Sequence, residues 1–378
     1  MNTQTTDAKL QAPEVIFEVH GQVGLITLNR PKALNALSLA MIRMLTQQLI
    51  AWQEDASVKA VAIRGTSKTG PFGVFCAGGD IRYFHQVALQ GGDELGVYFA
   101  EEYRLNHLIY TYSKPYIAFM DGVVMGGGMG ISQGAQVRVV TERTKMAMPE
   151  TNIGLFPDVG GGYFLSRCPG RMGEWLALSG ESIGAGDAVE FGLADTCFNS
   201  AKLASAWQAL GSLRFDRSNA SEAIDQWITM FSIATPTALT RATSQIDHYF
   251  AMGKLLDMVQ ALEADASPWA QHTAATLRRR SPLMLHVTLT QVRRARDLAL
   301  ADDLRMAYDL MHHCFNPVHL GRTADQSEAV EGIRALAIDK DFEPHWQPSR
   351  LEAVSASMVA PFFISPWVPK EHPLRDLM

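Results

Sequence analysis

Short β-branched runs and amphipathic segments alternate along the chain up to residue 212. Residues 15–29 form two apolar runs that break at His20 and Gly21, a pattern typical of a β-hairpin. Between Leu37 and Trp52 apolar side chains recur at helical spacing, which predicts an amphipathic helix. By the same criteria we expect strands at residues 60–63, 116–120, 137–140 and 145–148, and helices from residue 80 onward, over 98–112 and over 127–134. The alternation indicates an α/β or α+β fold whose functional residues lie on loops at strand ends.

After residue 213 the pattern becomes mainly helical. Helical periodicity covers residues 219–232, 236–264, 267–280 and 282–313. The one strand candidate in this part of the sequence is Arg334–Ile338. We therefore expect two regions: a mixed core over residues 1–212 that carries the active site, and a helical C-terminal region over residues 213–378.

Composition places the chain among ordinary globular proteins. Hydrophobic residues make up 47% of its 378 residues and charged residues 19%. The net charge of −6 argues against nucleic acid or a membrane surface as the partner, since both favour a basic face. The four cysteines have no C-x-x-C spacing, and the N-terminus has neither an apolar nor an arginine-rich leader. These features predict a soluble cytoplasmic protein.

Two motifs of known chemistry are present only in part. Residues 126–130 are rich in glycine, but no frame completes the G-x-G-x-x-G pattern of dinucleotide sites. Residues 180–184 match the G-x-S-x-G pattern around a nucleophilic serine, here Ser182. That motif requires a strand before it, whereas Met172–Ser179 has the composition of a helix. We interpret the segment as a turn between helices, and keep a serine hydrolase as an alternative.

A histidine cluster and an arginine run have ordinary explanations. His312, His313, Cys314 and His319 match no metal-ligand spacing, so we expect a capped helix end and no metal site. Arg278–Arg280 is typical of a solvated helix terminus, where cations are favoured by the helix dipole.

Two glycine-rich segments, residues 76–82 and 122–130, each lead into a predicted helix. The first N–H groups of a helix have no partner within it, and glycine lets a ligand oxygen approach the backbone. Two such helix starts facing one another would donate two hydrogen bonds to one carbonyl oxygen, forming an oxyanion hole. The alternative is two helix starts that merely pack tightly on the sheet.

Two carboxylates follow prolines in the same part of the chain: Glu150 after an apolar run, and Asp158 just before a glycine triplet. A carboxylate in apolar surroundings is costly to bury and has a shifted pKa, as general acids and bases do. The ordinary alternative is that the aspartate caps a helix.

These segments resemble the crotonase, or enoyl-CoA hydratase/isomerase, superfamily. The resemblance is carried by NRPKALNAL (29–37), CAGGDIR (76–82), GVVMGGGMG (122–130), MPETNIGLFPDVGGG (148–162) and GLAD (192–195). Further segments are similar to its 3-hydroxyisobutyryl-CoA hydrolase branch, namely EEYRLN (101–106), SPLMLHVTLTQ (281–291) and EGIRALAIDKD (331–341). The resemblance implies a spiral of repeated β-β-α units, followed by a mainly helical C-terminal region.

The resemblance also implies roles for individual residues. The N–H groups of Gly79 and Gly127 match the oxyanion hole for a thioester carbonyl. Glu150 matches the carboxylate that attacks the thioester or activates water, and Asp158 its acidic partner, which orients an acyl hydroxyl or assists proton transfer. Glu102 matches a carboxylate that contacts substrate. Gly127, Glu150 and Asp158 are expected to contact substrate as well.

Two departures from the hydratases of that family favour hydrolysis. Hydratases carry a second catalytic glutamate at the position of Gly130, and a small residue at the position of Asp158. Residues 312–326, by contrast, depart from the hydrolase branch itself, which leaves the acyl-chain preference open.

The implied reaction is hydrolysis of a short 3-hydroxyacyl-CoA, 3-hydroxyisobutyryl-CoA of valine breakdown, without a metal or redox cofactor. The alternatives are a hydratase or isomerase of the same fold and a non-catalytic acyl-CoA-binding protein. A homo-oligomer is among the expectations, and Lys32 and residues 278–280 are candidates to contact the CoA phosphates.

Overall fold

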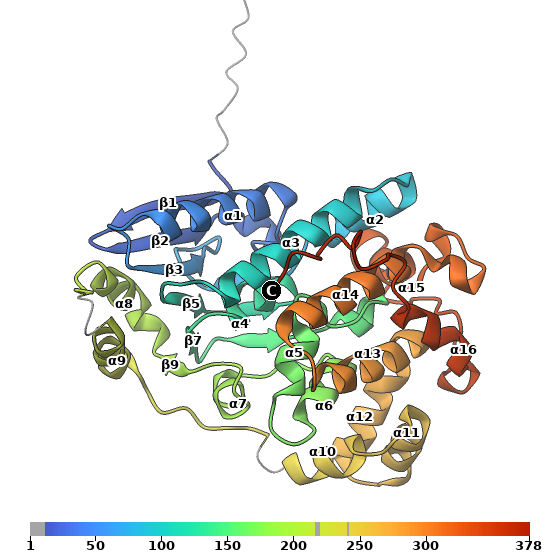
Figure 1. The fold of residues 1–378 in the computed structure, drawn as a ribbon. Helices are drawn as coiled ribbons and strands as arrows, with labels where there is room; N and C mark the ends of the chain where they lie inside the picture. Colours follow the sequence, from blue (N-terminus) through green and yellow to red (C-terminus); the bar gives the residue numbers. More distant parts are fainter. Residues whose placement is uncertain (1–11, 216–219, 240–241) are drawn as a thin grey trace, which may run out of the picture.

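A computed structural model describes residues 12–215, 220–239 and 242–378 (Figure 1). Its larger sheet has the strand order β1-β2-β3-β5-β7-β9, in which β1 and β2 form the antiparallel hairpin and the other neighbours are parallel. These strands are β1 (Val15–His20), β2 (Val23–Leu28), β3 (Ala60–Gly65), β5 (Tyr116–Met120), β7 (Val137–Thr141) and β9 (Thr196–Phe198). All residues of β2 and β5 are buried, as expected for parallel strands covered on both faces.

A second, smaller sheet is parallel throughout and has the order β4-β6-β8. Its strands are β4 (Val74–Cys76), β6 (Val123–Met125) and β8 (Lys145–Ala147). Each of them directly follows a strand of the larger sheet along the chain, and a helix then precedes the next strand of that sheet. This repetition of strand, strand and helix is the crotonase fold, which confirms the expected architecture.

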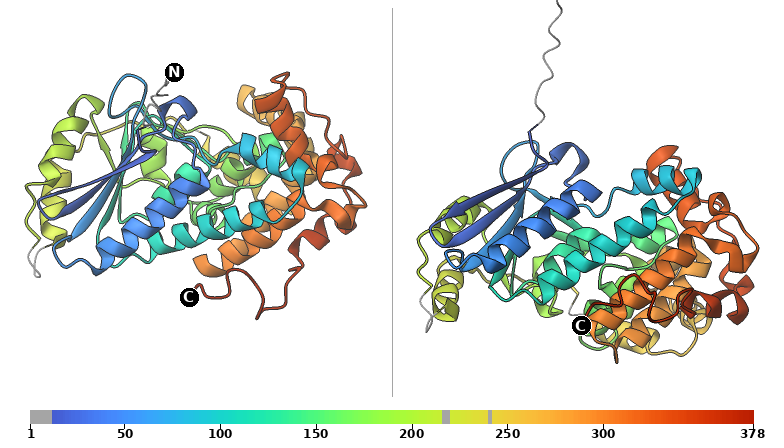
Figure 2. Two further views of the ribbon diagram at one scale, coloured as in Figure 1. Left: turned by 90° about the horizontal axis from the view of Figure 1, so that it is seen from above. Right: turned by 45° about the horizontal axis from the view of Figure 1, so that its top comes forward.

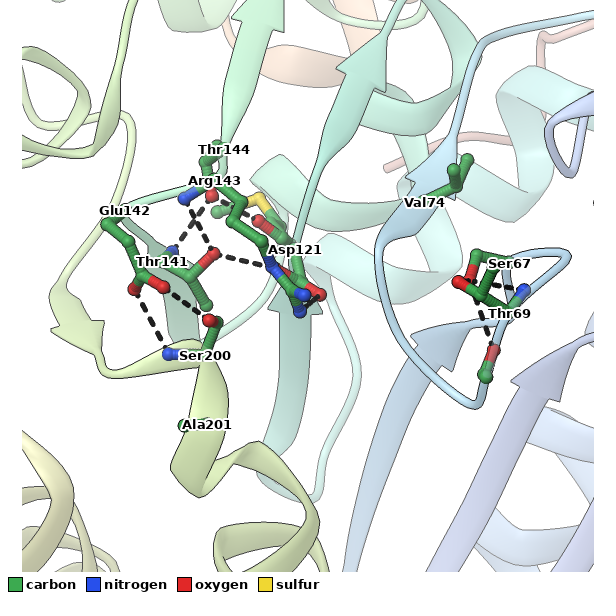
Figure 3. Close-up of polar contacts among 12 residues, drawn as sticks. Ser67, Thr69, Val74, Asp121, Thr141, Glu142, Arg143, Thr144, Ser200 and Ala201 are labelled. Carbon is green, nitrogen blue, oxygen red and sulfur yellow. Dashed lines mark hydrogen bonds and ion pairs between the residues drawn. The ribbon is translucent and has the colours of Figure 1, made fainter.

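Buried polar contacts stabilise the corners where the chain passes from one sheet to the other (Figure 3). At the β5–β6 corner Asp121 is 2% exposed, and its Oδ1 accepts hydrogen bonds from Thr141 Oγ1 at 2.6 Å and Arg143 Nε at 3.0 Å. Thr141 and Arg143 belong to the neighbouring β7–β8 corner, where Thr144 Oγ1 also donates to the Met120 carbonyl at 2.7 Å. Asp121 therefore ties two successive corners together.

Helices cover both faces of the larger sheet (Figure 2). On one face α1 (Leu39–Glu54) and α3 (Glu94–Tyr110) pack in the main core. On the other, α8 (Leu203–Leu210) and α9 (Ala220–Phe231) pack in a smaller cluster that includes Phe119 and Trp207. The remaining helices of the first part are α2 (Ile81–Gln90), α4 (Gly127–Gln133), α5 (Gly161–Ser166), α6 (Met172–Ser179) and α7 (Ala185–Glu190).

The C-terminal part is helical, and its helices pack on α3, α5 and α6 (Figure 1). It comprises α10 (Thr243–Phe250), α11 (Leu255–Ala264), α12 (Pro268–Arg279), α13 (Pro282–Ala295), α14 (Leu300–Phe315), α15 (Glu328–Ile333) and α16 (Ala356–Val359). Buried residues of these helices belong to the same core cluster as those of α1 and α3. The domain boundary near residue 213 stays a prediction.

Three expectations for this part were wrong. The helix expected over 236–264 is two helices, α10 and α11, with a break at 251–254; residues 236–239 are not helical, and residues 240–241 lie outside the described residues. The helix expected over 282–313 divides into α13 and α14. The expected strand Arg334–Ile338 is instead a short π-helical segment, η6, that continues α15. Helix is favoured here because Ser327 caps α15 and Arg334 forms an ion pair with Glu331, one turn earlier.

The corner contacts predict the effect of a single substitution. Asp121→Ala removes the acceptor for Thr141 and Arg143 in a buried place, so the free energy of unfolding should fall by about 1–3 kcal/mol. Urea denaturation measures the change. Glu54→Ala, at an exposed position in α1, is the control and should change it by no more than about 0.5 kcal/mol. Equal effects of the two substitutions would contradict a role of Asp121 in joining the corners.

Candidate active site

A pocket of about 190 Å³ lies where the glycine loops, α3 and the C-terminal helices meet. Three carboxylate side chains line it, and we call it the carboxylate pocket: Glu102 from α3, Glu150 from the 3-10 turn η2 (Glu150–Ile153), and Asp158 from the loop before α5. Gly79 and Gly127 line the same pocket. The structure thus brings together the five residues that the resemblance indicated for catalysis and acyl binding, whereas Lys32 and residues 278–280 do not line this pocket.

The two glycine loops lie against one another, as a pair of backbone donors requires. A Cβ atom on Gly78 would lie 3.6 Å from the Gly127 nitrogen. Gly127 is the first residue of α4, so its N–H has no partner within the helix. The neighbours of Gly79 pair with Leu37, through Leu37 N to Gly78 O at 2.8 Å and Asp80 N to Leu37 O at 3.2 Å. In such a parallel bridge the N–H of the central residue, Gly79, points to the other side.

Glycine is required in the second loop because two carboxylates approach its backbone. A Cβ atom on Gly126 would lie 2.8 Å from Glu150 Oε1, and one on Gly127 would lie 2.7 Å from Glu102 Oε1. Any side chain at either position would displace a carboxylate. The loop therefore holds two acidic groups next to the backbone N–H of α4.

Glu150 is positioned by contacts that the sequence did not indicate. Arg280 Nη1 donates to Asn152 Oδ1 at 2.6 Å, and Arg280 Nε donates to the Ser179 carbonyl at 2.9 Å. These bonds join the turn that carries Glu150 to the end of α6. The expectation that residues 278–280 are only a solvated helix terminus is therefore wrong for Arg280, whose bonding partners lie far away in the sequence.

Asp158 lies at the start of a tight turn. Its Oδ2 accepts a hydrogen bond from the Tyr103 hydroxyl at 2.8 Å, and both side chains are buried. The next two residues, Val159 and Gly160, have φ angles of 50° and 84°. Positive φ in a β-branched residue such as Val159 is a rare, strained conformation that occurs mainly at functional sites.

Burial raises the pKa values of all three carboxyl groups. Burial raises the pKa of Glu102 and Glu150 well above the ordinary value, and the charge of Asp158 raises both further. Burial also raises the pKa of Asp158, to about 6, against the opposing effect of the Tyr103 hydrogen bond. The described residues that line the pocket include no Lys, Arg or His to balance these groups. A carboxyl group with a raised pKa can exchange a proton nearer neutral pH, as general acid–base catalysis requires.

Gly130, which stands where hydratases carry a second glutamate, has no room for a side chain. A Cβ atom there would lie 2.7 Å from Val159 Cβ and 2.9 Å from Asn106 Nδ2. Two residues next to the pocket thus fill the space that a second catalytic carboxylate would need.

The structure does not support the two alternative sites, a nucleophilic serine at Ser182 and a metal site at the histidine cluster. Ser182 is exposed and follows the helix α6, so the strand that a nucleophilic serine requires is missing before it. His312–Cys314 lie in the last turn of α14, as expected of a helix end. Within the described residues, no three His, Cys, Asp or Glu side chains are grouped so as to hold a metal ion, and no helix has the length and hydropathy to cross a membrane.

Comparison with known proteins confirms the family that the sequence resembles. Residues 23–363 match the family model described as enoyl-CoA hydratase/isomerase. The chain belongs to this family. It is 41% identical to the mitochondrial 3-hydroxyisobutyryl-CoA hydrolase of Danio rerio, over 93% of this chain and 90% of that protein. The human mitochondrial protein of the same name is 37% identical, with 93% and 87% covered, and 3-hydroxyisobutyryl-CoA hydrolase 1 of Arabidopsis thaliana is 36% identical, with 93% and 91% covered.

Two solved structures are similar over nearly the whole chain. A carnitinyl-CoA dehydratase from Mycobacterium thermoresistibile is 37% identical with a TM-score of 0.84, and the match covers 95% of this chain and 98% of that one. An enoyl-CoA hydratase from Rhodobacter sphaeroides is 34% identical with a TM-score of 0.82, and the match covers 94% and 98%. The names of two relatives above include the word mitochondrial, so the expected cytoplasmic location is not confirmed.

The raised pKa of Glu102 predicts how stability depends on pH. A carboxyl group with a higher pKa in the folded chain destabilises the fold only above its unfolded pKa of about 4.3, increasingly as the pH rises to the folded value. Glu102→Gln should therefore raise the free energy of unfolding at pH 8 and change it little at pH 4. Urea denaturation at both pH values tests this, with Glu54→Gln as the exposed control. A gain at pH 4 as large as that at pH 8 would contradict the prediction.

Proposed function

We propose that this protein hydrolyses 3-hydroxyisobutyryl-CoA to 3-hydroxyisobutyrate and CoA, a step of valine catabolism, with Glu150 as the catalytic carboxylate. The observation that carries the proposal is the position of Glu150 next to the two backbone donors. Its Oε1 lies 2.8 Å from the place of a Cβ atom on Gly126, the residue before the Gly127 donor. Near-identical names among relatives that match over about nine-tenths of the chain support the same reaction.

The thioester carbonyl oxygen binds between the N–H groups of Gly79 and Gly127. Negative charge develops on this oxygen when the carbonyl carbon becomes tetrahedral, and each fixed donor in such a place contributes a few kcal/mol to the transition state. Because both donors are backbone groups on adjoining loops, they need no rearrangement as the charge forms.

Glu150 acts on the carbonyl carbon by one of two routes. As a nucleophile, it forms an acyl-enzyme anhydride as the carbon–sulfur bond breaks, and water then cleaves the anhydride and restores the carboxylate. As a general base, it removes a proton from water while the water oxygen attacks. In both routes one water is consumed, and the leaving thiolate of CoA ends with one proton. The raised pKa of Glu150 makes its carboxylate a stronger base for either step.

Asp158 and Glu102 select the acyl group. The 3-hydroxyl of the substrate donates to the Asp158 carboxylate, and Glu102, which lines the same pocket, helps to hold it. An acyl group without the hydroxyl leaves a buried acceptor without a partner, which is how a polar site rejects the simpler analogue. The proposal also includes the two expectations about partners. The protein binds acyl-CoA as its small-molecule substrate, and it can form a homo-oligomer.

Hydration of an enoyl-CoA, the reaction named for one of the two structural neighbours, is the second candidate. Water addition to a double bond uses two carboxylates that flank the substrate, and the second would come from position 130. Gly130 supplies none, and Val159 and Asn106 occupy the space around it. This arrangement favours hydrolysis over hydration.

Replacing the catalytic carboxylate tests the proposal. Glu150→Gln should lower the rate of CoA release from 3-hydroxyisobutyryl-CoA by about 100-fold or more while the fold stays intact, because an amide is neither base nor nucleophile here. A disulfide dye that reacts with free thiol measures the release, and circular dichroism checks the fold. Glu101→Gln, on the same helix as Glu102 but paired with Arg43 on the surface, should keep the rate.

A panel of substrates separates the candidate functions. The wild-type enzyme should release CoA faster from 3-hydroxyisobutyryl-CoA than from isobutyryl-CoA. A loss of enoyl absorbance from crotonyl-CoA without free thiol would identify a hydratase. Retained thiol release by the Glu150→Gln variant would overturn the assignment of Glu150.

A further inference from the structure

Tyr103 lies behind the carboxylate pocket and is not among the residues that line it. Its side chain is completely buried, and its ring packs between Phe99 and Tyr308 with centroid distances of 6.1 and 6.4 Å. The hydroxyl has one hydrogen-bond partner among the described residues, Oδ2 of Asp158 at 2.8 Å. Because these ring contacts hold the hydroxyl in place, Tyr103 positions the Asp158 carboxylate through the hydrogen bond. Tyr103 does not depend on Asp158 for its own position.

The backbone around Asp158 is held by separate contacts. Gly161 N donates to the Asp158 carbonyl at 2.6 Å, and Gln291 Nε2 of α13 donates to the Pro157 carbonyl at 2.7 Å. The Val159 side chain packs against Gly130 on the other side. These contacts fix where the turn lies but leave the Asp158 side chain free to rotate. Of the contacts described for that side chain, the one from Tyr103 restrains the rotation.

We propose that Tyr103 is a positioning residue that orients the Asp158 carboxylate toward the acyl group and so determines the preference for hydroxylated substrates. The inference rests on the function proposed above. With Oδ2 bound to Tyr103, Oδ1 is the oxygen left to accept the substrate hydroxyl. Neither the family resemblance nor the pattern around residues 101–106 assigned a role to this tyrosine.

The same bond makes the Asp158 carboxyl group easier to ionise than it would be without a donor. The titratable side chains that face Asp158 are Glu102, Tyr98 and Tyr103 from α3, Glu150 from η2 and Cys314 from α14. Glu102 Oε1 and Glu150 Oε2 have no hydrogen-bond partner among the described residues, whereas Asp158 has a fixed donor. Asp158 therefore ionises more readily than its neighbours, and the ionised carboxylate accepts the hydrogen bond that the substrate hydroxyl donates.

Tyr103→Phe tests the proposal, because it removes the hydroxyl and keeps the ring in its packing. We expect kcat/KM for 3-hydroxyisobutyryl-CoA to fall by about 10- to 100-fold, the range for a lost hydrogen bond to a charged group. For isobutyryl-CoA, which has no hydroxyl for Asp158, the fall should be about twofold or less. The acidic limb of the pH profile for the hydroxylated substrate should move to higher pH, since loss of the donor raises the pKa of Asp158.

Tyr112→Phe is the matched control. Tyr112 is also buried, and its hydroxyl donates to the Leu49 carbonyl at 2.7 Å, away from the pocket. This variant should have a similar cost in stability but keep the wild-type ratio of the two substrates. Asp158→Asn should lower the ratio of kcat/KM for 3-hydroxyisobutyryl-CoA to that for isobutyryl-CoA. In the double variant Asp158→Asn/Tyr103→Phe, this ratio should fall little further.

The outcomes separate this inference from the proposed function. If Tyr103→Phe lowers kcat/KM for both substrates equally, or leaves the ratio and the pH profile unchanged, Tyr103 has only a structural role and the inference is wrong. If the wild-type enzyme releases no CoA from either substrate, the proposed hydrolysis itself fails. A lowered ratio with a shifted acidic limb supports both.

Discussion

The burial of three carboxyl groups in one pocket is the constraint on which the rest of the structure depends. Glu102, Glu150 and Asp158 come from separate elements, and no cation lies among the described residues lining the space between them. Bringing such groups together costs free energy, because burial and mutual repulsion both oppose ionisation. The fold must therefore supply stability elsewhere, through a continuous apolar core and the bonded corners between the two sheets.

The C-terminal helices are part of the active site as well as of the core. Met311 of α14 and Leu336 of η6 line the carboxylate pocket. Arg280 holds the turn that carries Glu150, and Gln291 holds the turn that carries Asp158. Arg280 contacts the side-chain amide of Asn152, and Gln291 contacts the carbonyl of Pro157. Both contacts restrain the loops that carry the carboxylates, and neither side chain lines the pocket.

The sequence alone predicts the parts of the fold that depend on local pattern. The helix that begins near Leu37 and the strand at Tyr116–Met120 follow from periodicity, and the glycine loops from their composition. Strands β4 and β6 have three residues each, too few for a period of two to be visible. The break between α13 and α14 was missed because apolar positions continue across it.

At the site, too, residues in short motifs could be predicted, whereas residues defined by long-range contacts could not. The acidic residues and glycines could be named because each lies in a short motif, and the resemblance gave their roles. Arg280 and Gln291 could not, because their partners lie 128 and 134 residues away and nothing nearby in the sequence marks them. Tyr103 adjoins Glu102 in the EEYRLN segment, so the sequence placed it next to a site residue. The sequence did not show which residue its hydroxyl contacts. Only the packing of α3 shows that its hydroxyl reaches Asp158.

Space at one backbone position decides between the reactions that this fold can perform. The oxyanion donors bind any thioester carbonyl, so they do not discriminate between hydrolysis and hydration. The choice between hydrolysis and hydration depends on the positions of the carboxylates around the acyl group. At position 130 a side chain would collide with Val159, and Val159 is held in its strained conformation by the turn that presents Asp158. The same turn thus leaves no room for a side chain at position 130 and, in the proposed mechanism, presents Asp158 to the substrate hydroxyl. Position 130 and Asp158 are therefore linked structurally through Val159.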